Sequence, residues 1–234
     1  MMKMNVGLAE FVGAFIGDGC MSQYLRKGRH TKTRVILFTG NWEKDSQYYS
    51  KIINPILVKN FGKPGRIYHR KDDNTVRFIV GWKEVFSFLL SLGFSFGPKA
   101  STVFIPDIIL NDKTLSFSCL RGIFNTDGCI YSRYSKKYNK HPKIYSNYAV
   151  IQFKSNSKLL MNQVSFVLKR EGIIPNRIIK DKNAYVLRIT NQKEIGKFLP
   201  LVNINHDYHK ERIMNLMGPE GFEPPTYWSL SAGS

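Results

Sequence analysis

The sequence predicts an α+β fold made of two pseudo-symmetric αββαββα repeats that pack through their first helices. Two apolar runs, residues 11–19 and 120–128, each carry an acid followed by a glycine near the end. The two acids, Asp18 and Asp127, are 127 − 18 = 109 residues apart. Further matches as far as Leu89 recur at a spacing of 110 or 111 residues. One such match alone would be noise, but the series indicates an internal duplication.

These later matches include turn, strand and helix positions. They are Phe61-Gly62 with Glu171-Gly172, Arg66 with Arg177, Lys83-Glu84 with Lys193-Glu194, and Phe88-Leu89 with Phe198-Leu199. A duplicated unit whose first helices pair gives a molecule with approximate twofold symmetry.

Each element of the first repeat follows from its own pattern. Residues 8–16 are apolar apart from Glu10, which is typical of a buried helix. The pattern then predicts a hairpin, a helix with apolar residues at helical spacing, a second hairpin and an amphipathic helix closed by Gly93. Their ranges are 21–26 with 33–38, 44–60, 66–70 with 75–80, and 83–92. The second repeat follows the same order.

Composition changes divide the chain into four parts. We expect an N-terminal repeat over 1–96, a linker over 97–116, a C-terminal repeat over 117–217 and a tail over 218–234. The linker contains several residues that interrupt regular structure. The tail is rich in proline and glycine, lacks periodicity and has no counterpart in the first repeat, so we expect it to be poorly ordered.

The two apolar runs carry small residues four positions apart on one helix face. They are Gly13 and Gly17 in the first run and Gly122 and Thr126 in the second. An interior glycine costs roughly 1 kcal/mol relative to alanine, so its presence indicates that another backbone comes very close. The glycines directly after the acids, Gly19 and Gly128, are expected to end the helices in the left-handed conformation.

The two acids lie where a helix disfavours them. Asp18 and Asp127 fall at the carboxyl ends of their helices, where a carboxylate is disfavoured by roughly 0.3–1 kcal/mol. Two parallel helices in contact would also bring them together, which requires cations between them or raised pKa values. Oxygen ligands near phosphate suit Mg²⁺. The alternative for one run alone is an ordinary turn aspartate, but two matched copies favour a metal site.

The net charge points to a polyanionic partner. The chain has 35 Lys and Arg against 17 Asp and Glu, a formal charge of +18 and a pI of about 9.8. A ribosomal-type or membrane-surface protein is the plainer alternative. An aromatic content of 13% argues against a disordered basic tail.

The three cysteines, Cys20, Cys119 and Cys129, lack metal-site spacing and are expected to be reduced. We expect an intracellular protein, in the cytoplasm, nucleoid or an organelle matrix, because the first residues do not form a signal peptide. No run of about 20 apolar residues predicts a membrane span.

The paired runs resemble the repeated signature of LAGLIDADG homing endonucleases in their single-chain, two-repeat, monomeric form. The resemblance covers about residues 5–217. It implies that Asp18 and Asp127 bind catalytic Mg²⁺, and we include Gly17 and Thr126, directly before them, among the candidate metal-site residues. The family often has a further acid two residues earlier, where this chain has Ile16 and Asn125. Thr126 is a milder departure, because the family has a small residue there.

The resemblance also implies an activity. The expected reaction is a metal-dependent double-strand break across the minor groove of a long pseudo-palindromic DNA target, leaving 3′ overhangs. Family members use basic residues at the edge of the metal site, and by matched position the best candidates are Lys99 and Lys210. Lys154, at the end of the predicted strand 150–153, is a third candidate, although its counterpart in the first repeat is not a lysine. The histidines His69, His141, His206 and His209 are not spaced as a metal set, and we assign them no catalysis.

Basic and polar residues on the predicted strands are the candidate DNA contacts. Alternate side chains share one face of a sheet, and a curved basic sheet can lie in the major groove. The two antiparallel sheets would together form a DNA-binding saddle. The candidates are Gln23, Tyr24, Arg26, Arg34, Arg66, Tyr68, Arg70, Arg77, Arg133, Tyr134, Gln152, Arg177, Lys180 and Arg188. The alternative for each is a solvated surface charge.

Three other functions stay open. The first is an RNA maturase of the same fold that helps an intron to fold and needs no metal acids. The second is a non-catalytic DNA-binding regulator, expected to lose an acid and to gain a helix-turn-helix. The third is a basic protein of unrelated fold, which the duplication disfavours. Retention of both aspartates favours the endonuclease.

Overall fold

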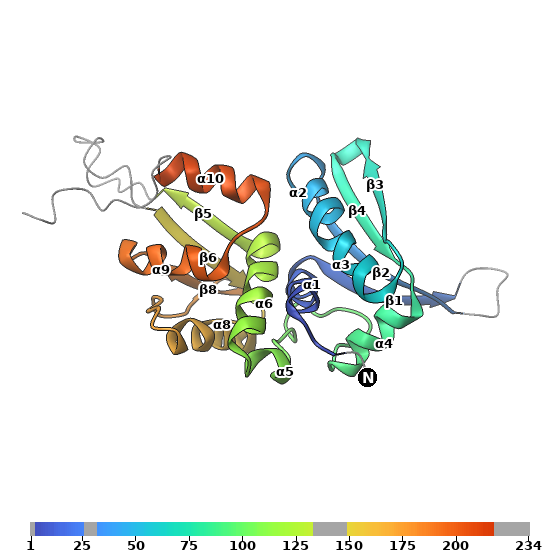
Figure 1. The fold of residues 1–234 in the computed structure, drawn as a ribbon, viewed down its shortest axis with the longest axis horizontal. Coiled ribbons are helices and arrows are strands. Elements are labelled where there is room, and N and C mark those ends of the chain that lie inside the picture. Colours follow the sequence, from blue (N-terminus) through green and yellow to red (C-terminus); the bar gives the residue numbers. More distant parts are fainter. Residues whose placement is uncertain (1–2, 26–31, 133–148, 218–234) are drawn as a thin grey trace, which may run out of the picture.

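The structure is a computed structural model that describes residues 3–25, 32–132 and 149–217. It has two halves, which meet through helix α1 of the first half and helix α6 of the second (Figure 1). The first half contains α1 (Val6–Gly17), β1 (Gly19–Leu25), β2 (Lys32–Asn41), α2 (Trp42–Tyr48), a π-helical turn η1 (Tyr49–Ile53), α3 (Asn54–Phe61), β3 (Arg66–Arg70), a 3₁₀ turn η2 (Lys71–Asp73), β4 (Thr75–Val80) and α4 (Lys83–Ser91).

The second half repeats this order after a short helix α5 (Asp107–Leu110). It contains α6 (Lys113–Asp127), β5 (Gly128–Ser132), β6 (Ala149–Ser155), α8 (Lys158–Arg170), β7 (Ile179–Asp181), β8 (Ala184–Ile189), α9 (Gln192–Val202) and α10 (Asp207–Met217). The predicted α+β fold with two αββαββα repeats is therefore confirmed. Helix α10 was not predicted, and α6 begins at Lys113, inside the predicted linker.

The two sheets have the same topology. Both are four-stranded and antiparallel, with the orders β1-β2-β4-β3 and β5-β6-β8-β7. Phe38 pairs with Phe78 in the first sheet and Phe153 with Leu187 in the second, and all four side chains are buried. These positions mark the sheet faces that the helices cover.

The helix predicted over 44–60 begins at Trp42 and contains the π-helical turn. The backbone N–H of Asn54 bonds to the carbonyl of Tyr49, five residues back. Pro55 follows and has no N–H to donate, and its ring would crowd the carbonyl four residues before it. The wider turn accommodates this proline and sets the position of Tyr49.

Helices α1 and α6 run parallel and approach through their small residues. A Cβ on Gly13 would lie 2.1 Å from the Cys119 carbonyl oxygen, and one on Gly122 would lie 2.2 Å from that of Glu10. Toward the carboxyl ends, a Cβ on Gly17 would lie 2.0 Å from Thr126 Oγ1. Backbone contacts this close exclude any larger residue at the two interior glycines.

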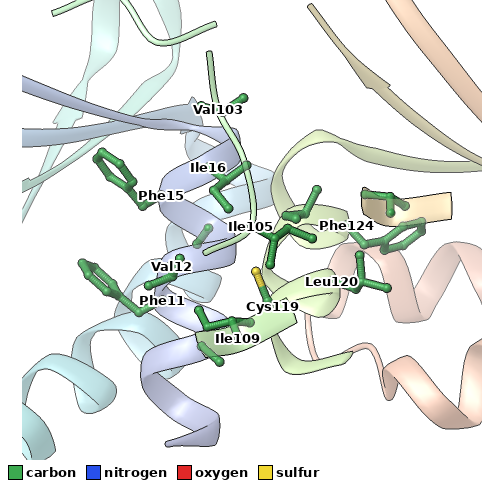
Figure 2. Close-up of a cluster of buried hydrophobic side chains, with 14 of the residues drawn as sticks. Phe11, Val12, Phe15, Ile16, Val103, Ile105, Ile109, Cys119, Leu120 and Phe124 are labelled. Carbon is green, nitrogen blue, oxygen red and sulfur yellow. The ribbon is translucent and has the colours of Figure 1, made fainter. Parts of the chain in front are cut away.

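Apolar side chains fill the space around the helix pair. Figure 2 shows Phe11 and Phe15 pointing from α1 into the first half, and Leu120 and Phe124 from α6 into the second. Ile105 lies between the helices and is fully buried. Each helix is thus buried on several sides, which explains why both runs are largely apolar.

The predicted left-handed conformation of Gly19 and Gly128 is wrong. Gly128 has φ −82° and ψ 160°, and Gly19 has no positive φ. Instead, a Cβ on Gly128 would lie 2.4 Å from both the ring and the carbonyl oxygen of Phe124, and one on Gly19 would lie 2.4 Å from the Phe15 ring. The glycines let each chain turn tightly from helix into strand beside a phenylalanine.

Within the described residues, no helix combines the length and the apolar character needed to cross a membrane.

Candidate metal centre and nucleic-acid interface

The carboxyl ends of α1 and α6 place Asp18 and Asp127 on the same side of the molecule. Asp18 caps α1, and Asp127 is the last residue of α6. The carboxyl carbon of Asp127 lies 3.4 Å from the position that a Cβ on Gly17 would occupy. The close helix contact therefore puts one acid from each repeat beside the other.

Asp18 is half-buried and has a protein donor. Tyr49 donates its hydroxyl hydrogen to Asp18 Oδ2 at 2.7 Å. Burial, together with the neighbouring charges of Asp127 and Asp45, raises the pKa of Asp18 to about 7, although the hydrogen bond from Tyr49 and the charge of Lys99 oppose this shift. A carboxylate in this state is prepared to ionise when a cation binds.

Asp127 is more exposed than Asp18. The surrounding protein still raises its pKa by removing water, and Lys99 lowers it. Lys99 is thus a cationic neighbour of both acids, which differ in exposure.

Lys99 is the basic residue that the fold brings to this pair. Its Nζ donates to the carbonyl oxygens of Ile16 and, at 3.0 Å, of Gly17. It also lies 5.4 Å from the centroid of the Phe15 ring. Burial lowers the pKa of Lys99 to about 8, although both aspartates oppose this shift. The ammonium therefore stands on the α1 side of the site.

The donor atoms fit a hard divalent cation. Two carboxylates with raised pKa values need an opposite charge between them, and an oxygen-only set suits Mg²⁺. Among the described residues no cluster of three or more His, Cys, Asp and Glu forms a complete metal cage. Water and phosphate oxygens would complete the shell, as is usual for Mg²⁺. The Thr126 hydroxyl donates a hydrogen bond to the Gly122 carbonyl oxygen at 2.9 Å.

The structure gives the other two candidate lysines acidic partners elsewhere. Lys154 Nζ lies 3.0 Å from Asp181 Oδ2, and Lys210 Nζ lies 3.9 Å from Asp207 Oδ1. Both side chains are about half exposed. Of the three lysines, Lys99 alone makes contacts at the ends of the paired helices.

In the first sheet, the strand register separates the DNA-contact candidates into two faces. Tyr68 pairs with Arg77, and the flanking residues Val76 and Phe78 are buried, so this pair lies on the face away from the core. Arg66 and Arg70 share the Tyr68 face, and Tyr24 is exposed near the end of β1. Gln23 and Arg34 instead fall on the core side, where Met21 and Ile36 lie, beyond the buried part.

Gln23 and Arg34 also contact each other. Arg34 Nε donates to Gln23 Oε1 at 3.0 Å. In the second sheet, Arg188 Nε donates to Gln152 Oε1 at 2.8 Å in the same manner. Each sheet thus holds one arginine guanidinium against a glutamine across two strands.

The remaining candidates of the second repeat lie near β7. Lys180 pairs with Tyr185 on the core side of the sheet, and Arg177 is exposed before the strand. Arg26, Arg133 and Tyr134 lie outside the described residues, as does the tail over 218–234.

A buried polar cluster between the repeats escaped the sequence reasoning. Arg121 donates to Glu10 Oε2 through Nε at 2.9 Å and Nη2 at 2.8 Å, and Asn205 Nδ2 donates to Glu10 Oε1 at 2.8 Å. His206 Nε2 lies 3.2 Å from Asp45 Oδ1. The acid within the otherwise apolar residues 8–16 was the available signal. Tyr49 was also missed, because it was counted as a core aromatic.

A family model gives the first comparison. The model of the LAGLIDADG-like domain matches residues 115–203. Among curated proteins, the replication factor C small subunit of Methanocaldococcus jannaschii is 27% identical over 222 residues, which is 92% of this chain and 10% of that protein. The chain thus spans about a tenth of that relative's length.

Solved structures give the second comparison. The homing endonuclease I-DmoI in complex with DNA and Mn is 20% identical, with a TM-score of 0.60 over 86% of this chain and 99% of that one. The N-terminal LAGLIDADG domain of DUF199/WhiA is 18% identical, with a TM-score of 0.53 over 87% and 86%. At these identities the likeness concerns the fold. The matched model thus identifies a LAGLIDADG-like domain in the second repeat, and the likeness to I-DmoI shows the same kind of fold across both repeats.

Proposed function

We propose that this chain is a site-specific DNA endonuclease that makes a divalent-metal-dependent double-strand break in a pseudo-palindromic target, leaves 3′ overhangs and acts as a monomer. The observation that carries the proposal is the meeting of Asp18 and Asp127 at the ends of two parallel helices, with Lys99 beside them. A regulator or a maturase would need neither the paired acids nor their raised pKa values.

Each part of the site has a defined task in this reaction. In each strand a water oxygen bonds to phosphorus, the P–O3′ bond breaks, and the leaving oxygen takes up a proton to give a 3′-hydroxyl and a 5′-phosphate. A bound divalent cation would polarise the phosphate and lower the pKa of the attacking water. Asp18 and Asp127 would hold that cation, Tyr49 would orient Asp18, and Lys99 would balance negative charge on the reacting phosphate.

The outer sheet faces would hold the duplex. Arg66, Tyr68, Arg70 and Arg77 lie on one face of the first sheet, and Arg188 lies beside Gln152 on the second. Arginine can bond guanine and glutamine can bond adenine in the major groove. The similarity in fold to I-DmoI, which was determined in complex with DNA and Mn or Ca, supports this use of the sheets.

A library experiment tests the proposal and identifies the target sequence in the same step. The protein is incubated with plasmids that carry randomised inserts, with Mg²⁺ or with EDTA, and linear products are sequenced. We expect a defined sequence to be cut with Mg²⁺ only. Asp18→Asn and Asp127→Asn should abolish cleavage and retain DNA binding, and Asp107→Asn, an exposed acid on α5, should behave as wild type. Binding without cutting would favour the regulator, and binding of intron RNA alone would favour the maturase.

A further inference from the structure

The segment after α9 repeats the segment after α4. Gly93 and Asn203 both have positive φ, at 91° and 49°, and are 110 residues apart. The next residues, Phe94 and Ile204, are each 6% exposed. Continuing at this spacing, Lys99 corresponds to His209 rather than to Lys210.

The surroundings of the two side chains also correspond. The ammonium of Lys99 lies 5.4 Å from the Phe15 ring centroid and bonds to the Ile16 carbonyl. The ring of His209 lies 5.1 Å from the Phe124 ring centroid and close to the Asn125 backbone. Phe124 and Asn125 match Phe15 and Ile16 at the 109-residue spacing of the acids. His209 therefore occupies the place of Lys99 against α6.

The side chains of Lys99 and His209 differ in whether they extend toward the two aspartates. Lys99 extends to the end of α1 and lies near both aspartates. His209 is 7% exposed and packs with the rings of His206 and Tyr208, at 5.0 and 5.4 Å between centroids. His206 in turn contacts Asp45 of the first repeat. The imidazole of His209 is thus part of the contact between repeats.

We propose that His209 replaces the second basic residue of the cleavage centre and serves instead as a packing residue, so that the two DNA strands are cut at unequal rates. This inference rests on the proposed endonuclease function. Lys99 places its cation on the α1 side, whereas its counterpart brings no side chain out to the acids on the α6 side. Burial, with His206 nearby, lowers the pKa of His209 to about 4, which keeps the ring uncharged at neutral pH.

The test follows both strands of one duplex. A duplex carrying the target recovered from the library is labelled differently on each strand and cut under single-turnover conditions. Removing one preorganised group that stabilises developing charge costs roughly 100-fold in rate. We therefore expect one strand to be cut about tenfold faster than the other, or more, with an accumulating nicked product.

Variants assign this inequality to Lys99. Lys99→Met should slow the faster strand by about 100-fold and bring the ratio of strand rates close to one. A purely structural loss would slow both strands by one factor and keep the ratio. Lys197→Met, which removes a lysine paired with Glu194 at 2.9 Å, is the matched control and should change neither rate. DNA binding in Ca²⁺, measured by fluorescence anisotropy, should be retained in both variants.

His209→Gln tests the second half of the proposal. Because His209 packs inward, this variant should leave the strand ratio within about twofold of wild type, with any loss appearing in the melting temperature instead. Equal strand rates in the wild type, or a selective loss of the slower strand in His209→Gln, would overturn the inference while leaving the proposed function intact. Failure to cut either strand of any library member would reject the proposed function itself.

Discussion

The first repeat surrounds its acid differently from the second. Asp18 is half-buried, accepts a hydrogen bond from Tyr49 and has Lys99 on its own helix end. Asp127 is exposed, and the place of the lysine is taken by His209. Both acids nevertheless end helices that lead into sheets of the same topology. The duplicated backbone has kept its geometry while the side chains around the two acids have diverged.

Both repeats place an interior glycine at the helix contact, and changing these glycines should have the largest effect. Gly13→Ala and Gly122→Ala should each cost about 4 kcal/mol of unfolding free energy or prevent folding, because the new Cβ meets backbone of the other helix. Chemical denaturation measures the loss. Gly62→Ala and Gly172→Ala have the same left-handed φ of 72° with open space around them, and should cost only about 1 kcal/mol. Equal costs at all four glycines would contradict the close contact.

The ion pair across this contact has no counterpart at the symmetry-related positions. Glu10 bonds to Arg121, whereas their matched positions hold Cys119 and Val12. Arg121→Met should therefore cost about 3 kcal/mol, because it leaves the Glu10 carboxylate buried without its cation. The exposed pair of Lys154 with Asp181 is the comparison, and Lys154→Met should cost less than about 1 kcal/mol. Similar losses in the two variants would show that Glu10 is held by its other donors.

Tyr49 sharpens the difference between the two acids. Tyr49→Phe removes the donor to Asp18 and should weaken Ca²⁺ binding, measured calorimetrically with target DNA present, by about tenfold. Tyr48→Phe is the matched control, because the Tyr48 hydroxyl donates to Glu10 at 3.4 Å and not to Asp18. Unchanged Ca²⁺ affinity in Tyr49→Phe would remove Tyr49 from the metal centre.

The raised pKa of Asp18 predicts a smaller, pH-dependent effect without metal. The unfolded chain ionises Asp18 near its ordinary pKa of 3.8 and the folded chain only near 7, so the folded state loses stability as the pH rises between these values. Asp18→Asn lacks this loss. Its stability relative to wild type should rise by about 1 kcal/mol or more between about pH 4 and pH 8 in EDTA. Asp127→Asn should show a smaller rise, because Asp127 is more exposed. A relative stability independent of pH would argue against the raised pKa.

The sequence predicted the repeats and the pairing of the acids, because periodicity and spacing report local structure and duplication directly. It predicted less about long-range partners. Tyr49 has the spacing of a core residue, and only the three-dimensional fold brings its hydroxyl to Asp18. The sequence comparison matched Lys99 with Lys210 because both are lysines, whereas the structural counterpart of Lys99 is His209, one position earlier. The sequence correctly predicts that Gly19 and Gly128 are needed, but it attributes this need to a left-handed backbone. In the structure the cause is the close approach of Phe15 and Phe124.

The contacts of residues 205 and 206 limit how far the repeats can be treated as modules. Asn205 and His206 follow the last strand of the second half, yet they bond to Glu10 and Asp45 of the first. A chimera that grafts either half onto a half from another protein of this fold would separate these partners. Engineers who recombine such proteins to change their target would have to transplant the acceptors on α1 and α2 along with the donor segment.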